Sequence, residues 1–525
     1  IFPVMNRHIN FHGKVRRYNH NLTYRNFFNG DIGELRPVWL EDGVPGDTFQ
    51  YHPEARIYFS PLIFPVLSSM KARVDVFFVP NRLAWNQWES FITGGPDNNL
   101  FPNYPSMRNI FSSLSGGTKT AFINSMVSQC KNSKSILNNL GHPVWSTYAS
   151  TDVANDPYDM IPYYDYLYIY DEYYRDEEKE RSFTGSGGIR RDIYEIWSYL
   201  SSIPDQMRLV SWSKDYFTTA SLEQQRGGDI PLLTNPMFQN TSGNTGLDGS
   251  AQLEFDTVND WQADLVDPNQ EQLESVLTIN GLRYLYSAAN WLNNNVIGGT
   301  RYIEVLRRRY KVVSSDARLQ RPEMIGSISI PVNIDVVTQT SSTVDDGTSI
   351  LALGDRAGKA SIVGSGKTLT YSCEEFGYFI GILHVAPKPA YFQGIRFNLQ
   401  REDKFDFWTP EFERVPQRPI RNNEIFADAT TLPPESGGTF GYTGQFNEYR
   451  FHNDEVHGDF IDTLLAWTTA RKFSSLPSAD SSAFLKVDPQ TRLFADEDSE
   501  YGHMFGVINN VVVAKREISN REPHF

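Results

Sequence analysis

The distribution of apolar residues along the chain predicts a protein made mainly of β-strands. Short runs rich in Val, Ile, Phe and Tyr recur, and clusters of Pro, Gly or Asn stop them. The clearest run, residues 74–79, ends at Pro80, which cannot donate a ladder hydrogen bond. Because this run is almost continuously apolar, we expect a strand that is covered on both faces. The other strand-like runs are residues 36–40, 55–59, 376–385 and 505–515.

Helical periodicity occurs in several segments between these runs. Residues 161–181 place tyrosines at helical spacing and end in a group of acidic residues. Neighbouring carboxylates at a helix end are usually solvated, so they do not predict an acid-base pair. The other segments with helical spacing are residues 120–140, 271–296, 300–312 and 453–473.

The amino-acid composition predicts long loops between these elements. The 525 residues include 29 Pro and 37 Gly, which divide the chain into short elements, and 14% aromatic residues. A chain of this length could form two or three domains, or one domain with large insertions. Residues 96–156 are rich in Asn and Ser, and residues 235–267 are poor in apolar side chains, so both are expected to be insertions or loops.

Charge and cysteine content narrow the class of protein. A net charge of -15 argues against nucleic-acid binding over the whole surface, because phosphate binding needs clustered Lys and Arg. Cys130 and Cys373 are too few for a disulfide framework, which is consistent with folding in a reducing cytoplasm, although a single bridge is possible. No apolar run reaches the roughly 18 residues that a membrane span requires, so we expect no membrane insertion.

Residues 1–34 are predicted to be a basic N-terminal arm. No acidic residue precedes Asp31, and cations alternate there with aromatic residues and histidines. Such a segment suits sequence-tolerant contact with single-stranded DNA, through charge neutralisation and base stacking. A solvated arm, or one that clasps a neighbouring subunit, is the alternative. The predicted DNA-binding residues of the arm are Arg7, Lys14, Arg16, Arg17 and Arg25.

A second basic cluster lies in the helix-like segment 300–312. Arg307, Arg308 and Arg309 fall within one helical turn. Contact with DNA is one interpretation. The other is a solvated helix face that pairs with acidic residues of a neighbouring subunit.

The sequence contains no group of residues typical of an enzyme. Nucleophile elbows, zinc-binding helices and C-x-x-C pairs are absent. Residues 364–368, GSGKT, look like the end of a phosphate loop, but Ser361 occupies the position of the required glycine. His452, Asp454, His457 and Asp459 resemble a metal-ligand set, yet short polar residues before a helix are usually caps. We therefore predict no enzymatic activity, no cofactor and no metal.

Four motifs resemble those of a known family. They are VPGDTF (44–49), IFPV (63–66), VDVFFVPNRLAWNQWESF (74–91) and the stretch from LQRPEM to VVTQTS (319–341). They are similar to the major capsid proteins of the Microviridae, the small single-stranded-DNA bacteriophages, and above all to the gokushovirus-like branch. The resemblance implies a mainly β fold, an eight-stranded antiparallel jelly roll with long, partly helical insertion loops. Residues 221–228 and the tail 516–525 depart from the family pattern.

The resemblance also implies a function. Residues 35–525 would form a single jelly-roll domain with insertions near 96–156 and 229–312, and residues 229–270 are favoured for a surface protrusion. The chain would be a major capsid protein that self-assembles, as sixty copies, into a T=1 icosahedral virion with host-attachment loops. The implied partners are circular genomic single-stranded DNA, internal scaffolding and pilot proteins, and a host surface receptor such as a glycan. Assembly would occur in the host cytoplasm.

Aromatic residues near prolines are the candidates for subunit contacts. We assign this role to Trp85, Trp88, Trp408 and Phe412, each of which could instead pack inside its own subunit. The alternative function is a secreted jelly-roll carbohydrate-binding module. It predicts a monomer whose aromatic residues stack on sugars in a groove.

Overall fold

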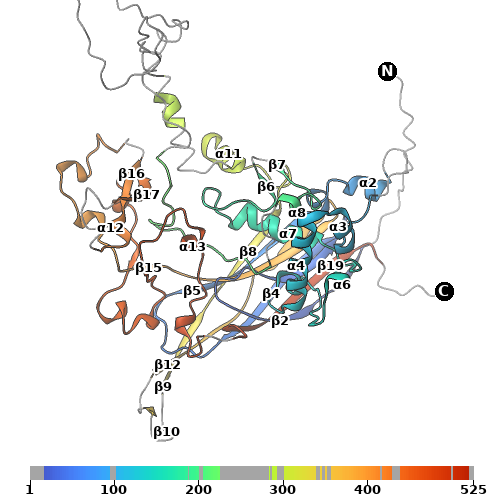
Figure 1. The fold of residues 1–525 in the computed structure, drawn as a ribbon, viewed down its shortest axis with the longest axis horizontal. Helices are drawn as coiled ribbons and strands as arrows, with labels where there is room; N and C mark the ends of the chain where they lie inside the picture. Colours follow the sequence, from blue (N-terminus) through green and yellow to red (C-terminus); the bar gives the residue numbers. More distant parts are fainter. Residues whose placement is uncertain are drawn as a thin grey trace, which may run out of the picture.

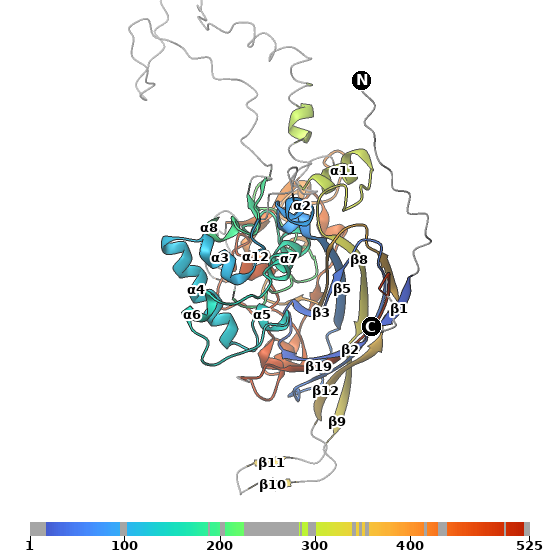
Figure 2. The same cartoon turned by 90° about the vertical axis from the view of Figure 1, so that its right-hand side faces the viewer.

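Two antiparallel sheets lie face to face at the centre of the molecule, and helices cover one side of the pair (Figures 1 and 2). The computed structural model describes residues 17–94, 102–186, 189–199, 205–224, 283, 286–291, 301–338, 343–345, 349–351, 356–413, 417–428, 438–497 and 500–518.

The eight main strands are shared equally between the two sheets. The first sheet has the order β3 (Arg36–Gly43), β14 (Gly377–Pro387), β5 (Met70–Pro80), β8 (Glu323–Pro331). The second has β2 (Tyr24–Gly30), β19 (Met504–Arg516), β4 (Thr48–Phe59), β12 (Arg356–Ser365). Three further strands extend the second sheet: β1 (Tyr18–Asn21), β9 (Asn333–Thr338) and β13 (Leu369–Ser372).

The order of these strands is that of a jelly roll. Successive main strands alternate between the sheets, except at β5 and β8, which are neighbours in the first sheet. This alternation is the double Greek key of the jelly roll, so the predicted fold is confirmed. The five strand-like runs lie in β3, β4, β5, β14 and β19. As expected, the run in β5 is buried on both faces.

Aromatic rings and one amide fill the space between the sheets. Trp39 of β3 stacks on Tyr51 of β4 with ring centroids 4.0 Å apart, and Phe379 of β14 packs beside Trp39. Asn510 of β19 is fully buried. It accepts a hydrogen bond of 2.9 Å from the Tyr51 hydroxyl and donates one of 2.9 Å to the carbonyl of Val38. The side-chain amide of Asn510 thus fixes how the two sheets are aligned, because another alignment would leave this buried amide without hydrogen-bond partners, which is costly.

Helical segments after β5 cover the outer face of the first sheet. The central one is α7 (Ile161–Ile169), whose residues are all buried, followed by a π-helical turn, η1 (Tyr170–Tyr174). The Tyr166 hydroxyl donates to the carbonyl of Leu35, and the Tyr174 hydroxyl donates to Asp75 at 2.7 Å. The flanking helices are α1 (Asn81–Ala84), α2 (Trp88–Thr93), α3 (Met107–Ser113), α4 (Gly116–Lys131), α5 (Ile136–Asn139), α6 (Ser150–Val153) and α8 (Ile196–Tyr199).

The acidic end of this tyrosine-rich helix is not solvated, contrary to our expectation. Asp171 is 3% exposed, because residues 182–184 fold back over the π-helical turn. Its carboxylate accepts hydrogen bonds from the backbone N–H of Thr184 at 2.6 Å and from the Ser182 hydroxyl at 2.8 Å. Glu180 forms an ion pair of 2.9 Å with Lys486. These carboxylates therefore hold the insertion together.

His384 of β14 lies under η1 and should make stability depend on pH. Burial lowers the pKa of His384 to about 4. The carboxylate of Asp75, 3.8 Å away, has a smaller effect that raises this pKa. The neutral imidazole is thus favoured in the folded state, so its contribution to stability is present above about pH 6.5 and is lost as the pH falls toward 4. We expect this loss to be about 3 kcal/mol.

The variant His384→Gln tests this prediction, because glutamine does not titrate. Urea unfolding at pH 7 and at pH 4.5 should show a smaller pH dependence in the variant than in the unchanged protein. An equal loss of unfolding free energy in both proteins would contradict the assignment to His384.

The N-terminal arm is shorter than predicted. From Tyr18 onward the chain forms β1 and β2, which pair with β19. Residues 18–30 are therefore part of the jelly roll, because the edge of β19 satisfies their backbone hydrogen bonds. Residues 1–16 lie outside the described residues.

The helical predictions have mixed outcomes. The segment 300–312 contains α11 (Tyr302–Tyr310), and the segment 120–140 is divided between α4 and α5. Only residues 283 and 286–291 of the segment 271–296 are described, and they are helical. The helix predicted at 453–473 is wrong. That segment forms β18 (Asp454–Glu455) and the short 3-10 turns η5 (Gly458–Ile461) and η6 (Leu465–Trp467), because its apolar residues pack into a small separate cluster with Ala390 and Val456.

A smaller C-terminal part packs around its own apolar cluster, which includes Ile420, Phe440 and Phe484. Its elements are β15 (Ala390–Tyr391), η2 (Phe397–Leu399), η3 (Lys404–Asp406), β16 (Gln417–Arg421), α12 (Asn422–Ile425), β17 (Thr439–Gly444), η4 (Asn447–Tyr449), α13 (Ser482–Leu485) and η7 (Thr491–Leu493).

The two cysteines are buried and unbridged. Within the described residues, no helix is both long and apolar enough for a membrane span.

Candidate functional site

Seven exposed apolar side chains gather in the C-terminal part, drawn in orange on the left of Figure 1. Their exposed fractions range from 36% to 73%, which is unusual for so many large apolar side chains in two short segments. We call this set the aromatic shelf. It consists of Leu399, Phe405, Phe407, Trp408, Phe412, Tyr449 and Phe451.

Short turns, not regular elements, hold these rings at the surface. The carboxylate of Asp406 accepts hydrogen bonds from the backbone N–H groups of Glu402 and Asp403, which closes the turn η3. The guanidinium of Arg401 lies 4.8 Å from the ring centroids of both Phe407 and Tyr449, so it joins the two segments of the shelf. The rings are therefore ordered before any partner binds.

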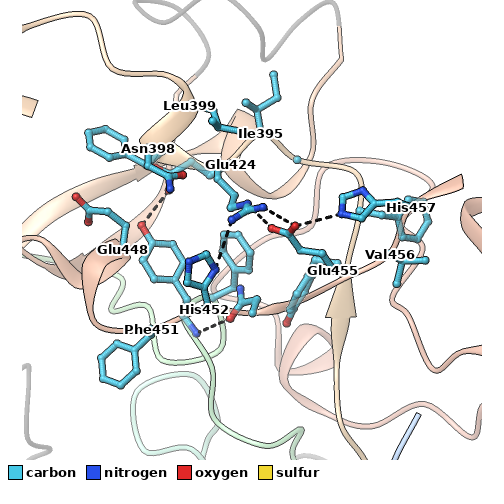
Figure 3. A pocket seen from close by; sticks show the side chains of 18 residues that line it. Ile395, Asn398, Leu399, Glu424, Glu448, Phe451, His452, Glu455, Val456 and His457 are labelled. Carbon is cyan, nitrogen blue, oxygen red and sulfur yellow. Dashed lines mark hydrogen bonds and ion pairs between the residues drawn. The ribbon is translucent and has the colours of Figure 1, made fainter. Parts of the chain in front are cut away.

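A cavity of about 300 Å³ opens beside the shelf (Figure 3). Leu399 and Phe451 belong both to the shelf and to the cavity lining. Across the cavity, Arg396 donates a hydrogen bond of 2.6 Å to Glu455, whose carboxylate also lies 3.3 Å from His457. Figure 3 shows Glu455 and His457 side by side in the lining of the cavity. The shelf and the cavity thus form one continuous, largely apolar surface.

A buried ion cluster lies under this surface. Arg418 contacts Glu424 at 3.3 Å and Glu448 at 3.2 Å, and its guanidinium lies 3.8 Å from the ring centroid of Phe397. Burial alone would lower the pKa of Arg418, but the two carboxylates raise it above its ordinary value. Tyr216 donates a hydrogen bond of 2.9 Å to Glu424, and burial with this carboxylate raises the pKa of Tyr216. The cluster joins β16, α12 and η4 beneath the shelf.

This arrangement is suited to binding and not to a reaction. The three carboxylates beside the cavity are paired with Arg418 or Arg396, so none of them is poised as a general base. The supposed metal-ligand set does not converge, since Asp454 pairs with Lys388 at 2.7 Å and His457 contacts Glu455. In the described part of the chain, no three His, Cys, Asp or Glu side chains form a group that could hold a metal ion.

The predicted DNA-binding residues lie in separate places. Arg17 is partly exposed and 3.5 Å from Glu517, and Arg25 is exposed on β2. Arg307, Arg308 and Arg309 lie on α11, which Figures 1 and 2 place apart from β2. Arg7, Lys14 and Arg16 lie outside the described residues. The structure does not bring the two basic groups together.

The predicted contact residues divide into core and surface. Trp85 is 0% exposed and packs against Trp88, Phe91 and Tyr104, so the expectation of a subunit contact at Trp85 is corrected. The reason is that the insertion covers the end of β5, which the sequence does not show. Trp88 is half-buried. Trp408 and Phe412 are exposed on the shelf.

Sequence reasoning missed Leu399, Tyr449 and Phe451, whereas Phe405 and Phe407 belong to the stretch 405–418, whose alternating aromatic and charged residues are typical of a contact surface. Tyr449 and Phe451 lie about forty positions after Trp408. The ring contacts of Arg401 and a hydrogen bond of 3.4 Å from the Trp408 backbone N–H to the Tyr449 hydroxyl join the two segments. The recurrence of aromatic residues beside charged ones in both segments was the available signal.

Comparisons with known proteins agree with this picture. A family model described as Capsid protein (F protein) matches residues 10–518. The Capsid protein VP1 of Bdellovibrio phage phiMH2K is 26% identical over 530 residues, 94% of this chain and 92% of that protein. The Capsid protein VP1 of Chlamydia phage 1 is 24% identical over 92% of this chain and 91% of that protein. The Capsid protein VP1 of Spiroplasma virus 4 is 30% identical, over 40% of this chain and 38% of that protein.

Proposed function

Starting from the fact that this chain belongs to the capsid protein (F protein) family, we propose how it builds its shell. The protein is a major capsid protein of a bacteriophage, with a structural and not an enzymatic function. Its relatives over about nine-tenths of the chain carry capsid names, and none of them supports a secreted carbohydrate-binding module.

The proposed shell has T=1 icosahedral symmetry, with sixty copies around circular single-stranded DNA. Closed symmetry allows one chain to build a container by repeating the same contacts. Internal scaffolding and pilot proteins and a host surface receptor are the further proposed partners, and the host cytoplasm is the proposed place of assembly. The residues 229–270 proposed for a surface protrusion lie outside the described residues. In the other candidate segment, Phe122 and Met126 of α4 are buried in the core.

The aromatic shelf is the observation that carries the assembly proposal. Its rings are ordered by their own turns yet remain exposed in the single chain, so a partner is needed to bury them. A second copy of the chain is the natural partner in a shell made of identical subunits. Trp408 and Phe412 are therefore proposed subunit contacts, and Trp88 stays a weaker candidate.

Electron microscopy of the purified full-length protein tests the proposed shell. We expect closed particles of one diameter, with a symmetry that a reconstruction identifies as T=1. A population of dispersed monomers under all assembly conditions, or particles of higher triangulation number, would overturn this part of the proposal.

A further inference from the structure

The outer face of the second sheet of the jelly roll is not covered by other described parts of the chain. Along β4, buried residues alternate with exposed ones, as in a sheet with one solvated face. Figure 2 shows the helices on the opposite side of the molecule, and no described helix lies over this sheet. We call this surface the open sheet face. Its outward residues include Arg25, Phe27, Asn29, Gln50, Glu54, Arg56, Tyr58, Lys359, Ser361, Val363, Phe505, Asn509 and Lys515.

The charge of the open sheet face is opposite to that of the whole chain. Its exposed cations are Arg25, Arg56, Lys359 and Lys515, and none of them forms an ion pair with another described residue. The outward acidic residues of its strands are Glu54 and Asp335. One of these, Glu54, already accepts a hydrogen bond of 2.9 Å from Asn509. A chain with a net charge of -15 thus presents, on the face of one sheet, an excess of cations that pair with no acidic group in the described parts of the chain.

Aromatic rings lie among these cations on three adjacent strands. Phe27 of β2 is 75% exposed, Tyr58 of β4 is 46% exposed and Phe505 of β19 is 40% exposed. Phe505 lies directly opposite Tyr58, and Phe27 lies opposite Val507, one step further along the same face. Arg56 is opposite Val507 as well, so rings and guanidinium groups occupy neighbouring rows. Exposed apolar side chains that are grouped on one surface are typical of a binding site.

We propose that the open sheet face is a binding platform for single-stranded DNA, with bases stacked on Phe27, Tyr58 and Phe505 and phosphates held by Arg25, Arg56 and Lys359. The proposal rests on the proposed function, in which the shell encloses single-stranded DNA. An antiparallel sheet with exposed rings can stack two or three unpaired bases, whatever their sequence. The unpaired cations complement phosphate charge.

Double-stranded DNA fits this surface less well, because its bases are stacked inside the duplex and cannot cover the rings. A protein partner would have to supply acidic groups opposite each cation, or leave charges buried and unpaired. The Asn, Ser and Gln side chains between the rings add hydrogen-bond donors and acceptors for bases or sugars. Single-stranded DNA is therefore the occupant to which we commit.

Binding of a fluorescent oligothymidylate to the full-length chain tests the charge contacts. We expect the double variant Arg25→Gln and Arg56→Gln to bind more weakly and to reduce the salt dependence, the slope of log K against log salt, by about 1.4. The matched control is Lys131→Gln with Lys134→Gln, which removes two cations from α4 and the turn after it. The control should leave both the affinity and the slope unchanged.

Substitution of Phe27 tests the stacking contact separately. Phe27→Ser should weaken oligothymidylate binding about fivefold or more at fixed salt, without changing the salt slope. Phe27→Tyr should restore binding, because the ring is kept. Since Phe27 points into solvent, all three proteins should melt at similar temperatures. Equal binding by the Ser and Tyr variants would overturn the stacking role.

Particles made from these variants separate this inference from the proposed function. If the sheet variants form normal shells that hold less DNA, the platform is supported. If they form shells with unchanged DNA content and bind oligothymidylate as the unchanged protein does, the platform is wrong although the capsid function stands. If they lose shells but keep DNA binding, the face contacts another subunit and the inference also fails. Failure of the unchanged chain to form any shell would instead refute the proposed function.

Discussion

The double variant Trp408→Ser and Phe412→Ser should stay folded and fail to form shells. Both side chains are exposed in the single chain, so their removal takes little from the core of the subunit. In an assembled interface, buried aromatic anchors typically contribute about 2 kcal/mol or more each. Two such losses at every repeated contact should raise the protein concentration needed for assembly by at least about a hundredfold.

Light scattering across a series of protein concentrations measures this threshold, and thermal melting of the monomer checks the fold. Trp145→Ser is the matched control, because Trp145 is 49% exposed, as against 48% for Trp408, and lies on the helical insertion. We expect the control to assemble at the ordinary concentration. Shells formed by the double variant at that same concentration would remove the shelf from the assembly interface.

Replacement of Arg418 by Ala should destabilise the C-terminal part by about 3–5 kcal/mol. The substitution leaves the carboxylates of Glu424 and Glu448 buried without their cation, and it removes the guanidinium from the ring of Phe397. Because the cluster underlies the shelf, loss of the cation should also loosen the turns that hold the rings. Hydrogen exchange over residues 417–444 measures the effect locally, where a single global unfolding transition cannot be assumed.

Arg396→Ala is the internal comparison for this experiment. Arg396 and Glu455 form an ion pair in the same region, but the Arg396 side chain is 45% exposed. An exposed pair contributes roughly 0–1 kcal/mol, so exchange in the Arg396 variant should change little. If the Arg418 and Arg396 variants showed equal protection from hydrogen exchange over residues 417–444, burial of the Arg418 cluster would not be the source of its stabilising effect.

The sequence predicted the strands well because their signal is local. A run such as residues 74–79 shows both its apolar content and its proline stop within a few positions, and β19 was equally clear. The jelly-roll order followed from the resemblance of whole motifs to capsid proteins. Strand order itself is not encoded locally, since β19 pairs with β4 across more than 400 intervening residues.

Three of the wrong predictions share one physical cause, which is a contact made only in the folded chain. The acidic end of 161–181 looked solvated until residues 182–184 folded over Asp171, and Trp85 looked like a surface anchor until the insertion covered it. The basic residues before Asp31 looked like a free arm, but the edge of β19 takes up residues 18–30. In each case the deciding contact lies outside the short segment that carries the pattern.

The amino-acid sequence by itself predicted a mainly β fold, because strand patterns can be read along the chain, and the resemblance of its motifs to capsid proteins implied a shell protein. Only the tertiary structure decided which aromatic residues reach the surface and which cations remain unpaired. The seven side chains of the shelf and the outward residues of the open sheet face come from segments far apart in the chain. Exposure and pairing are properties of contacts, and the contacts exist only after the strands have found their partners.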